Sequence, residues 1–208
     1  NISVADDIVV TKVYEHTIED QIMNSIGLPC YVKPVTQGSS IGITKVYEKS
    51  RIRKALDYAF EYDDKVLVEK NIISREFECA VINSEAMLCS EIGEVIVNSE
   101  YYSSNIKNIK SSKVHVQIPA DVDLRNYEEM KQIAMKTFKA LECNCMAKID
   151  LFLTAENKII VNEVNTMPGF AELSTFPKLW KVSGLPYGEL LQILLKGVVE
   201  RKLLTLIL

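Results

Sequence analysis

Cysteine pairs and uninterrupted hydrophobic runs are missing from this chain of 208 residues, which excludes several classes of protein. The five cysteines are scattered, include no Cys-x-x-Cys pair, and at Cys143-x-Cys145 stand too close for the usual zinc knuckle. Their odd number and scatter predict reduced thiols in a cytoplasmic protein. The leucine-rich end, residues 190–208, is interrupted by charged residues, so it predicts a packed amphipathic helix rather than a membrane span.

An excess of positive charge is also absent, since 24 Lys and Arg residues face 28 Asp and Glu residues, which gives a net charge of −4. This balance argues against a general nucleic-acid or membrane-surface binder, although it permits a local basic pocket for phosphates. The chain opens on Asn1 without a signal peptide, and its first strand-like stretch, residues 2–13, has no partner nearby in the sequence. We therefore expect a piece of a longer protein.

What the chain does contain is an alternation of strand-like and helix-like segments. A hydrophobic share of 48% and a charged share of 25% are typical of a soluble globular protein with one large core or two small ones. The alternation predicts an α+β or mixed α/β fold. The expected helices cover residues 17–26, 50–62 (capped by Ser50) and 124–141, and the expected strands cover 30–34, 41–46, 66–70, 77–82, 86–91 and 114–119.

Two strand-like segments joined by a turn signal at residues 156–157 are the most informative part of the sequence. Because side chains alternate along a strand, Lys148 shares a face with Asp150, and Glu163 shares one with Asn165. A two-residue turn would set Asp150 opposite Glu163. The same register would set Lys148 opposite Asn165. One face of the sheet would then carry two carboxylates, an amide oxygen and an ammonium group.

The oxygen atoms of this predicted face form a ligand set suited to Mg²⁺. Phosphate oxygens would complete the octahedral coordination of the ion. The expected metal ligands are Asp150, Glu163 and Asn165. A hairpin at the edge of a sheet, with a solvated polar face and an ordinary ion pair, would show the same residues. The hairpin by itself therefore leaves both interpretations open.

A lysine at a strand end, followed by a flexible loop, indicates a second site that suits a polyphosphate. Lys33 precedes Gly38-Ser39-Ser40, whose backbone N–H groups and hydroxyls can wrap phosphates while the lysine neutralises an oxygen. The lysine comes before the loop, so the spacing is not that of a Walker motif. An ordinary hairpin turn with a surface lysine is the alternative.

Polar residues at the end of the expected strand 66–70 indicate a third site. Groups at Glu69 and Lys70, with backbone amides just beyond, can hydrogen-bond a purine, and Glu76 is near enough to hold ribose hydroxyls. Taken separately, these side chains would be surface charges. Residues 99–113, rich in Tyr, Ser, Asn and Lys, are long for a connection inside a domain and predict a functional or mobile loop.

These motifs occur in a characteristic order over nearly the whole chain. The most diagnostic pattern is Glu-x-Asn-Thr-x-Pro-Gly at residues 163–169. The other stretches are Tyr31-Val-Lys-Pro34, Gly38-Ser-Ser-Ile-Gly-Ile-Thr-Lys-Val46, Val68-Glu-Lys70, Arg75-Glu-Phe-Glu-Cys-Ala-Val81, Lys148-Ile-Asp150 and Pro177-Lys-Leu-Trp-Lys-Val-Ser-Gly-Leu185. Together they resemble the D-alanine–D-alanine ligase family of the ATP-grasp superfamily, and its cell-wall ligases more than its glutathione-synthetase or carboxylase relatives.

The resemblance implies an α+β ATP-grasp fold, in which two α/β subdomains with mainly antiparallel sheets clasp the nucleotide between them. The implied division is a central nucleotide-binding subdomain at residues 1–72 and a carboxy-terminal subdomain at 73–208, with the metal hairpin and a lid loop at 99–113. The implied activity is the ATP- and Mg²⁺-dependent joining of two D-alanines, through an acyl phosphate, for peptidoglycan precursor synthesis. The alternatives are a D-Ala–D-Ser or D-Ala–D-Lac ligase of glycopeptide resistance and a non-catalytic nucleotide-binding relic.

The resemblance also implies roles for single residues. Two Mg²⁺ ions, replaceable by Mn²⁺, would bind Asp150, Glu163 and Asn165, with Glu163 bridging them. The residues implied to bind ATP are Lys33, Ser39, Ser40, Glu69, Lys70, Ile72 (through its backbone), Glu76 (at the ribose) and Lys107 (at the γ-phosphate). The implied catalytic residues are Lys148, Lys107 and Ser40. The implied substrate residues are Ser174 and Gly169.

The chain also departs from the family. Lys148 stands where the family usually has arginine, so it offers a point charge rather than a planar fork. The family's amino-terminal domain, which supplies much of the first D-alanine site, is expected to be missing, so we expect the isolated chain to be weakly active or inactive. The implied partners are D-alanine and ATP, without nucleic acid or membrane, and the full-length protein is expected to be a cytoplasmic homodimer. We interpret His16 and His115 as structural or surface residues.

Overall fold

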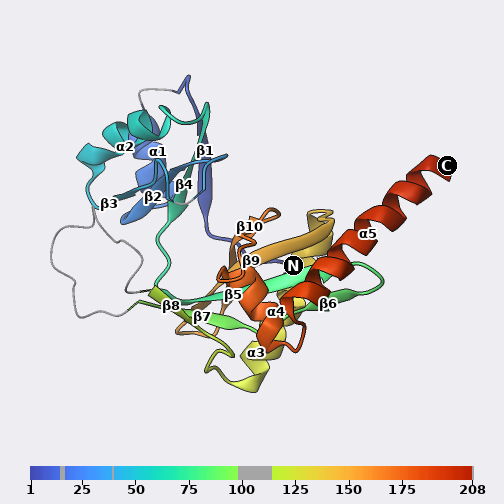
Figure 1. Cartoon of the computed structure of the whole chain (residues 1–208). Coiled ribbons are helices and arrows are strands. Elements are labelled where there is room, and N and C mark those ends of the chain that lie inside the picture. The colour runs from blue at the N-terminus through green and yellow to red at the C-terminus, as the bar shows by residue number, and fades with distance from the viewer. Residues whose placement is uncertain (15–16, 39, 98–113, 208) are drawn as a thin grey trace. The chain divides into compact units, whose positions relative to one another are not determined.

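Alternating buried and exposed residues along the strands build two sheets, each in its own compact unit, in the computed structural model (Figure 1). The structure describes residues 1–14, 17–38, 40–97 and 114–207, with the backbone alone at 114 and 200–207. One unit is Val4–Ile73, and the other combines Asn1–Ser3 with Ser74–Leu208. The first residues belong to the second unit because the Val161 N–H donates to the Ser3 carbonyl oxygen at 2.9 Å.

The unit Val4–Ile73 is an antiparallel sheet with helices on one face. Its described elements are β1 (Asp7–Thr11), α1 (Ile18–Ser25), β2 (Cys30–Pro34), β3 (Thr44–Val46), a 3-10 helix (Lys49–Arg51), α2 (Ile52–Ala59) and β4 (Lys65–Lys70). The strands are ordered β1-β4-β2-β3. Alternate side chains such as Val32 of β2 and Val68 of β4 are fully buried against Ile22 of α1 and Leu56 of α2. The opposite sheet face is therefore free to carry polar residues.

The second unit is a larger antiparallel sheet with its own helices. Its described elements are β5 (Ser74–Asn83), β6 (Met87–Cys89), β7 (Gly93–Val97), β8 (Val114–Gln117), α3 (Leu124–Ala140), β9 (Cys145–Thr154), β10 (Ile159–Asn165), α4 (Thr175–Val182) and α5 (Tyr187–Ile207). The sheet order is β10-β9-β5-β7-β8, and β6 pairs with β5. The long strands β5 and β9 form the middle of this sheet and align along their whole length.

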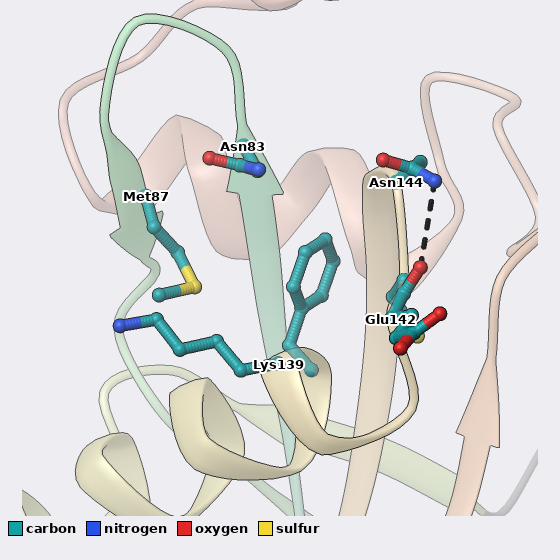
Figure 2. A pocket seen from close by; sticks show the side chains of 7 residues that line it. Asn83, Met87, Lys139, Glu142 and Asn144 are labelled. Carbon is teal, nitrogen blue, oxygen red and sulfur yellow. Dashed lines mark hydrogen bonds between the residues drawn. The ribbon is translucent and has the colours of Figure 1, made fainter.

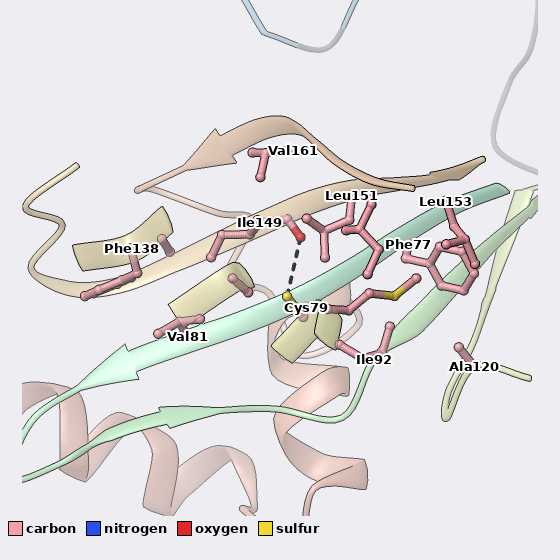
Figure 3. Close-up of a cluster of buried hydrophobic side chains, with 14 residues drawn as sticks. Phe77, Cys79, Val81, Ile92, Ala120, Phe138, Ile149, Leu151, Leu153 and Val161 are labelled. Atoms are coloured by element: carbon pink, nitrogen blue, oxygen red, sulfur yellow. Dashed lines mark hydrogen bonds between the residues drawn. The ribbon is translucent and has the colours of Figure 1, made fainter. Parts of the chain in front are cut away.

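Both faces of the larger sheet are packed, but differently. On one face, alternate residues such as Phe77, Cys79 and Ile149 form a buried core with Phe138 of α3, as Figure 3 shows. There the Cys79 thiol donates to the carbonyl oxygen of Ile149 at 3.7 Å. On the other face, one end of β5 packs under α4 and α5 through Ala80, Ile82, Phe176, Leu179, Trp180 and Leu190. The remainder of that second face carries the polar residues considered below.

The segment after β2 differs from the sequence expectation. The predicted strand 41–46 is shortened to β3, because Gly42 has a φ of +73° and a Cβ there would lie 2.6 Å from Pro34 Cγ. Ser50 does not cap a helix: it lies inside the 3-10 helix, and Arg51 precedes α2 without a side-chain capping bond. The prediction of a serine cap was therefore wrong.

Strand β7 was absent from the sequence expectation. It begins at Gly93, a residue that strand propensity disfavours. The structure shows why glycine is needed: a Cβ at Gly93 would lie 2.6 Å from Val116 and 3.1 Å from Leu179. This close approach of β8 and α4 is not visible in the local sequence.

The leucine-rich end forms α5, of which only one side packs against the sheet. Leu190 is fully buried, and Ile193 and Leu194 pack against the same cluster. Leu195 and Val199 are 65% and 58% exposed, so the outward face is more apolar than an amphipathic helix implies. Among the residues that the structure describes, no helix is long and apolar enough to cross a membrane.

Candidate functional site

The hairpin of β9 and β10 carries the expected metal ligands, but its turn differs from the prediction. The Thr154 N–H donates to the carbonyl oxygen of Lys158 at 3.1 Å, and Asn157 adopts a left-handed conformation with a φ of +61°. These features define a three-residue turn, so the expected two-residue turn was wrong. The turn pairs Ile159 with Leu153, one residue away from the expected register.

A β-bulge between Val161 and Glu163 restores the expected pairing. Val161 packs in the core under α3, and unbroken alternation would turn Glu163 toward that core as well. The extra residue, Asn162, reverses the alternation. Glu163 then pairs with Asp150, as the sequence analysis expected. The bulge therefore keeps the carboxylate out of the core.

Lys148 lies between two carboxylates on this face and pairs with Asn165 across the strands. Its ammonium group donates to Glu78 Oε1 at 2.6 Å and to Asp150 Oδ1 and Oδ2 at 2.7 and 2.8 Å. The Lys148, Glu78 and Asp150 side chains are only 16%, 14% and 22% exposed. The ammonium is thus enclosed by its two anionic partners.

Burial and charge act in opposite directions on this cluster. Burial raises the pKa of Asp150 to about 6, although the neighbouring Lys148 opposes the shift. Burial also disfavours the Lys148 ammonium, but the Asp150 and Glu78 carboxylates outweigh it and raise the pKa of Lys148. Lys148 is therefore charged at neutral pH, while Asp150 binds a proton more readily than an exposed aspartate.

Glu78 was not among the expected site residues. It lies opposite Asp150 in the β5–β9 pairing, and its Oε2 atom is buried without a hydrogen-bond partner among the described residues. The available signal was the alternation at residues 75–78, which puts Glu76 and Glu78 on one face of a strand. That signal gains meaning only once β5 and β9 are known to be neighbours. Burial and the nearby Glu78 charge raise the pKa of Glu76, the expected ribose ligand.

The expected metal ligands are compatible with a hard divalent cation. Asp150 and Glu163 are cross-strand partners, and the Glu163 charge acts on the pKa of Asp150. The Asn165 Oδ1 atom accepts a hydrogen bond from the Met167 N–H at 2.9 Å, which fixes the amide. In the described part of the chain, no group of three or more His, Cys, Asp or Glu side chains could hold a metal ion. The expected ligand set is of another kind, because it has two carboxylates and one amide. Its all-oxygen chemistry suits Mg²⁺.

The expected substrate residues lie close together after β10. A Cβ at Gly169 would lie 3.1 Å from the Ser174 hydroxyl oxygen, so a side chain there would crowd that hydroxyl. Ser174 precedes α4 but makes no side-chain capping bond. Its hydroxyl therefore lies at the start of a helix, where backbone N–H groups favour a carboxylate.

In the unit Val4–Ile73, two of the expected nucleotide ligands form an ion pair on the sheet face opposite the helices. Lys33 Nζ lies 2.5 Å from Glu69 Oε2, and the side chains are 23% and 17% exposed. The same face carries Tyr31, with the Lys45 ammonium 5.0 Å from its ring centroid. Two ammonium groups, a carboxylate and an aromatic ring thus share one face. Lys45 was not among the expected site residues.

The structure does not bring the other expected ligands of this unit to the Lys33–Glu69 pair. Lys70 follows Glu69 and therefore points to the other side of β4, where it lies 3.5 Å from Asp6. Ile72 lies just beyond the strand and is half-buried. Ser40 is exposed in the loop before β3, with a φ of +61°.

Some expectations fall on residues outside the described part of the chain. Ser39, Lys107, His16 and the loop at 99–113 all lie there. His115 lies on β8 and is exposed. The expectations for Ser39, Lys107 and the loop remain predictions.

A cavity of about 360 Å³ lies away from the polar hairpin face, at the far end of β5 (Figure 2). Asn83, Met87, Lys139 and Glu142 are among the residues that line it, and Asn144 donates a hydrogen bond to the Glu142 carbonyl oxygen at 3.4 Å. The expected site residues that the structure describes do not line this cavity. Its position therefore gives no support to the predicted chemistry.

Comparison with known proteins agrees with the resemblance found in the sequence. Residues 2–196 match the profile of a family described as "D-ala D-ala ligase C-terminus". A D-alanine–D-alanine ligase A of Chromobacterium violaceum is 42% identical over 180 residues, which cover 86% of this chain and 49% of that protein. A counterpart in Salmonella typhimurium is 38% identical over 201 residues, covering 96% and 55%. The chain spans about half the length of these curated relatives.

A solved structure extends the agreement to three dimensions. The VanG D-Ala:D-Ser ligase from Enterococcus faecalis is 32% identical to the chain, with a TM-score of 0.84 over 93% of this chain and 56% of that one. The likeness covers the antiparallel sheets described above, which are those expected of an ATP-grasp fold. The chain belongs to the D-ala D-ala ligase C-terminus family and has the ATP-grasp fold.

Proposed function

We infer that this chain supplies the nucleotide- and metal-binding part of a D-alanine–D-alanine ligase that uses ATP and Mg²⁺ in peptidoglycan precursor synthesis. The observation that carries the inference is the cross-strand pairing of Asp150 with Glu163 and of Lys148 with Asn165. It gathers the oxygen ligands and the positive charge that phosphoryl transfer needs on one face. The names of the similar ligases supply the substrate.

The proposed reaction has two steps. The carboxylate of one D-alanine takes the γ-phosphoryl group of ATP, which gives an acyl phosphate and ADP. The amine of a second D-alanine then attacks the acyl carbon, the amine loses a proton, and phosphate leaves as the peptide bond forms. Asp150, Glu163 and Asn165 would hold Mg²⁺, which would neutralise charge on the phosphate oxygens. In this chain Lys148 holds a fixed positive charge beside the ligands, where it would stabilise the oxyanion of the second step.

The individual roles follow from the family resemblance, with support from position. Asp150, Glu163 and Asn165 would hold the metal ions, because their oxygens share one face. Gly169 and Ser174 would bind the substrate carboxylate at the start of α4. The residues proposed to bind ATP are Lys33, Ser39, Ser40, Glu69, Lys70, Ile72, Glu76 and Lys107.

The proposal includes the wider organisation of the protein. The division at residues 72 and 73 into a nucleotide-binding and a carboxy-terminal subdomain is supported by the two compact units. We also propose that the complete protein is a homodimer and that it lies in the cytoplasm, and the free cysteines are in keeping with the second of these proposals. Size-exclusion chromatography with light scattering on the complete protein measures the oligomeric state.

Calorimetric titration of the 208-residue chain with Mg²⁺-ATP tests the proposal. Glu163→Gln should weaken binding about tenfold or more, because it removes a charge from the metal site. Glu156→Gln is the matched control, since it makes the same chemical change in the turn of the same hairpin and should leave binding unchanged. Equal effects of the two changes would contradict the proposal. An ATP-dependent ligation assay with D-alanine, D-serine and D-lactate then identifies the second substrate.

A further inference from the structure

Glu78 is the one member of the polar cluster described above to which the family resemblance gave no role. It touches Lys148 at 2.6 Å and is 14% exposed. Its second oxygen, Oε2, is buried and has no hydrogen-bond partner among the described residues. Burying a carboxylate oxygen without a hydrogen-bond partner costs free energy. We therefore expect a state of the site in which Oε2 has a partner.

The contacts of Lys148 suggest what that state is. An ammonium group has three N–H donors, and in this structure they serve Glu78 Oε1 and both oxygens of Asp150. A divalent cation on Asp150 needs at least one of those two oxygens. Lys148 must then give up a contact with Asp150, and its freed donor needs another acceptor nearby.

The Oε2 atom of Glu78 is such an acceptor. It belongs to the carboxylate that already holds Lys148, and Glu78 lies directly opposite Asp150 in the sheet. We propose that Glu78 is a positioning residue, which keeps the Lys148 ammonium on this face when a divalent cation occupies Asp150. The proposal rests on the metal site of the proposed function and adds a residue that acts on it through Lys148.

The consequence concerns competition between Lys148 and the metal ion. With Glu78 present, Lys148 can release Asp150 and still contact the Glu78 carboxylate. With Gln at position 78, Asp150 is the remaining carboxylate in contact with Lys148, so the ammonium holds it more tightly against the metal ion. Glu78→Gln should therefore weaken metal binding, and the effect should depend on Lys148.

The test is a titration of the 208-residue chain with Mn²⁺ alone, followed by electron paramagnetic resonance of the free ion. Glu78→Gln should weaken Mn²⁺ binding about tenfold, and Glu78→Asp should lose less, because the charge remains. The matched control is Glu94→Gln, at a glutamate in the same sheet that is 13% exposed and ion-paired with Arg75 at 2.7 Å. The control should change Mn²⁺ binding less than about twofold, although both changes neutralise a mostly buried carboxylate that is paired with a cation.

A double-mutant cycle separates positioning from direct ligation. In a Lys148→Met background, where the competing ammonium is gone, Glu78→Gln should cost about twofold at most. A loss that stays tenfold in that background would overturn the proposal, because Glu78 would then act on the ion directly. An effect of Glu78→Gln no larger than that of Glu94→Gln would overturn it too.

Asp150→Asn distinguishes this proposal from the function on which it rests. If Asp150→Asn weakens Mn²⁺ binding while Glu78→Gln behaves like the control, the metal site stands and the positioning role fails. If Asp150→Asn leaves Mn²⁺ binding intact, the metal site and the positioning role both fail. Thermal unfolding of each variant verifies that it is folded, and Glu78→Asp replaces Glu78→Gln in the comparison if the latter does not fold.

Discussion

At the scale of single residues, the site depends on where charges are buried rather than on how many there are. Lys148 contacts two carboxylates within 2.8 Å, and all three side chains are mostly buried. In a site that is so enclosed, the pKa of each charged group depends strongly on the neighbouring charges. The raised pKa of Asp150, about 6, is the clearest sign of this sensitivity.

The first prediction concerns the pH dependence of metal binding. Protonated Asp150 is a poor metal ligand, so affinity should be fully present above its pKa of about 6 and should fall as the pH drops through it. Between pH 7.5 and pH 5, Mn²⁺ affinity of the 208-residue chain should decrease roughly tenfold, since one proton competes with the ion. Calorimetry at the two pH values measures it. If Asp150→Asn, which binds more weakly, shows the same pH dependence, Asp150 is not the titrating group.

The second prediction concerns the loop that precedes β3. Gly42→Ala should lower the free energy of unfolding of the unit Val4–Ile73 by about 1–2 kcal/mol, because a φ of +73° is unfavourable with a side chain. The added Cβ would also meet Pro34 and Tyr62. Gly38→Ala in the same loop is the control, because a Cβ there meets nothing within 4 Å. Urea denaturation compares the two, and equal stability would contradict this account.

At the scale of secondary-structure elements, the sequence predicts the long strands and helices well, because their hydrophobic periodicity is strong. β2, for example, has the expected bounds, Cys30–Pro34, and α3 runs from Leu124 as expected. The pairing of Asp150 with Glu163 is also as expected, although it results from two departures from the expected hairpin that cancel each other. A three-residue turn shifts the register by one, and the bulge at Asn162 shifts it back. Neither deviation has a hydrophobic signature, so periodicity could not reveal them.

The third prediction tests the bulge. Deletion of Asn162 would join Val161 directly to Glu163, so ordinary alternation would keep Glu163 opposite Asp150 and away from the core under α3. The variant should therefore retain Mn²⁺ binding within about twofold, since a one-residue slip of register is what would turn the carboxylate inward. Insertion of a glycine after Glu156 is the control, because an exposed turn accepts extra length at little cost. A folded deletion variant that loses Mn²⁺ binding would contradict the assignment of Asn162 as the extra residue.

At the scale of the whole molecule, the sequence predicts the residues of the site better than their grouping. Asp150 and Glu163 are neighbours along one hairpin, so local pattern finds them. Glu78 reaches Lys148 only because β5 lies beside β9, 70 residues away in the chain. Such contacts between distant segments have no local signal. The ion pair of Glu94 with Arg75, which joins the neighbouring strands β7 and β5, was not expected for the same reason.

The fourth prediction concerns the activity of the chain by itself. It spans about half the length of its curated relatives, so we expect it to bind Mg²⁺-ATP weakly and to ligate little or no D-alanine. An unpositioned first substrate forfeits a proximity gain of about 7 kcal/mol or more. Calorimetry and a dipeptide-formation assay on the same preparation measure both properties. Rapid dipeptide synthesis by the 208-residue chain would contradict the expectation.

The most direct test of the central claim, that the polar face of the β9–β10 hairpin is a metal site, is crystallography of the chain with Mn²⁺ and ADP. The anomalous signal locates the ion independently of any assumption about its ligands. We predict a peak about 2.0–2.3 Å from carboxylate oxygens of Asp150 and Glu163, with Lys148 moved from Asp150 toward Glu78. A peak away from the hairpin, with Lys148 still paired to both oxygens of Asp150, would contradict the account.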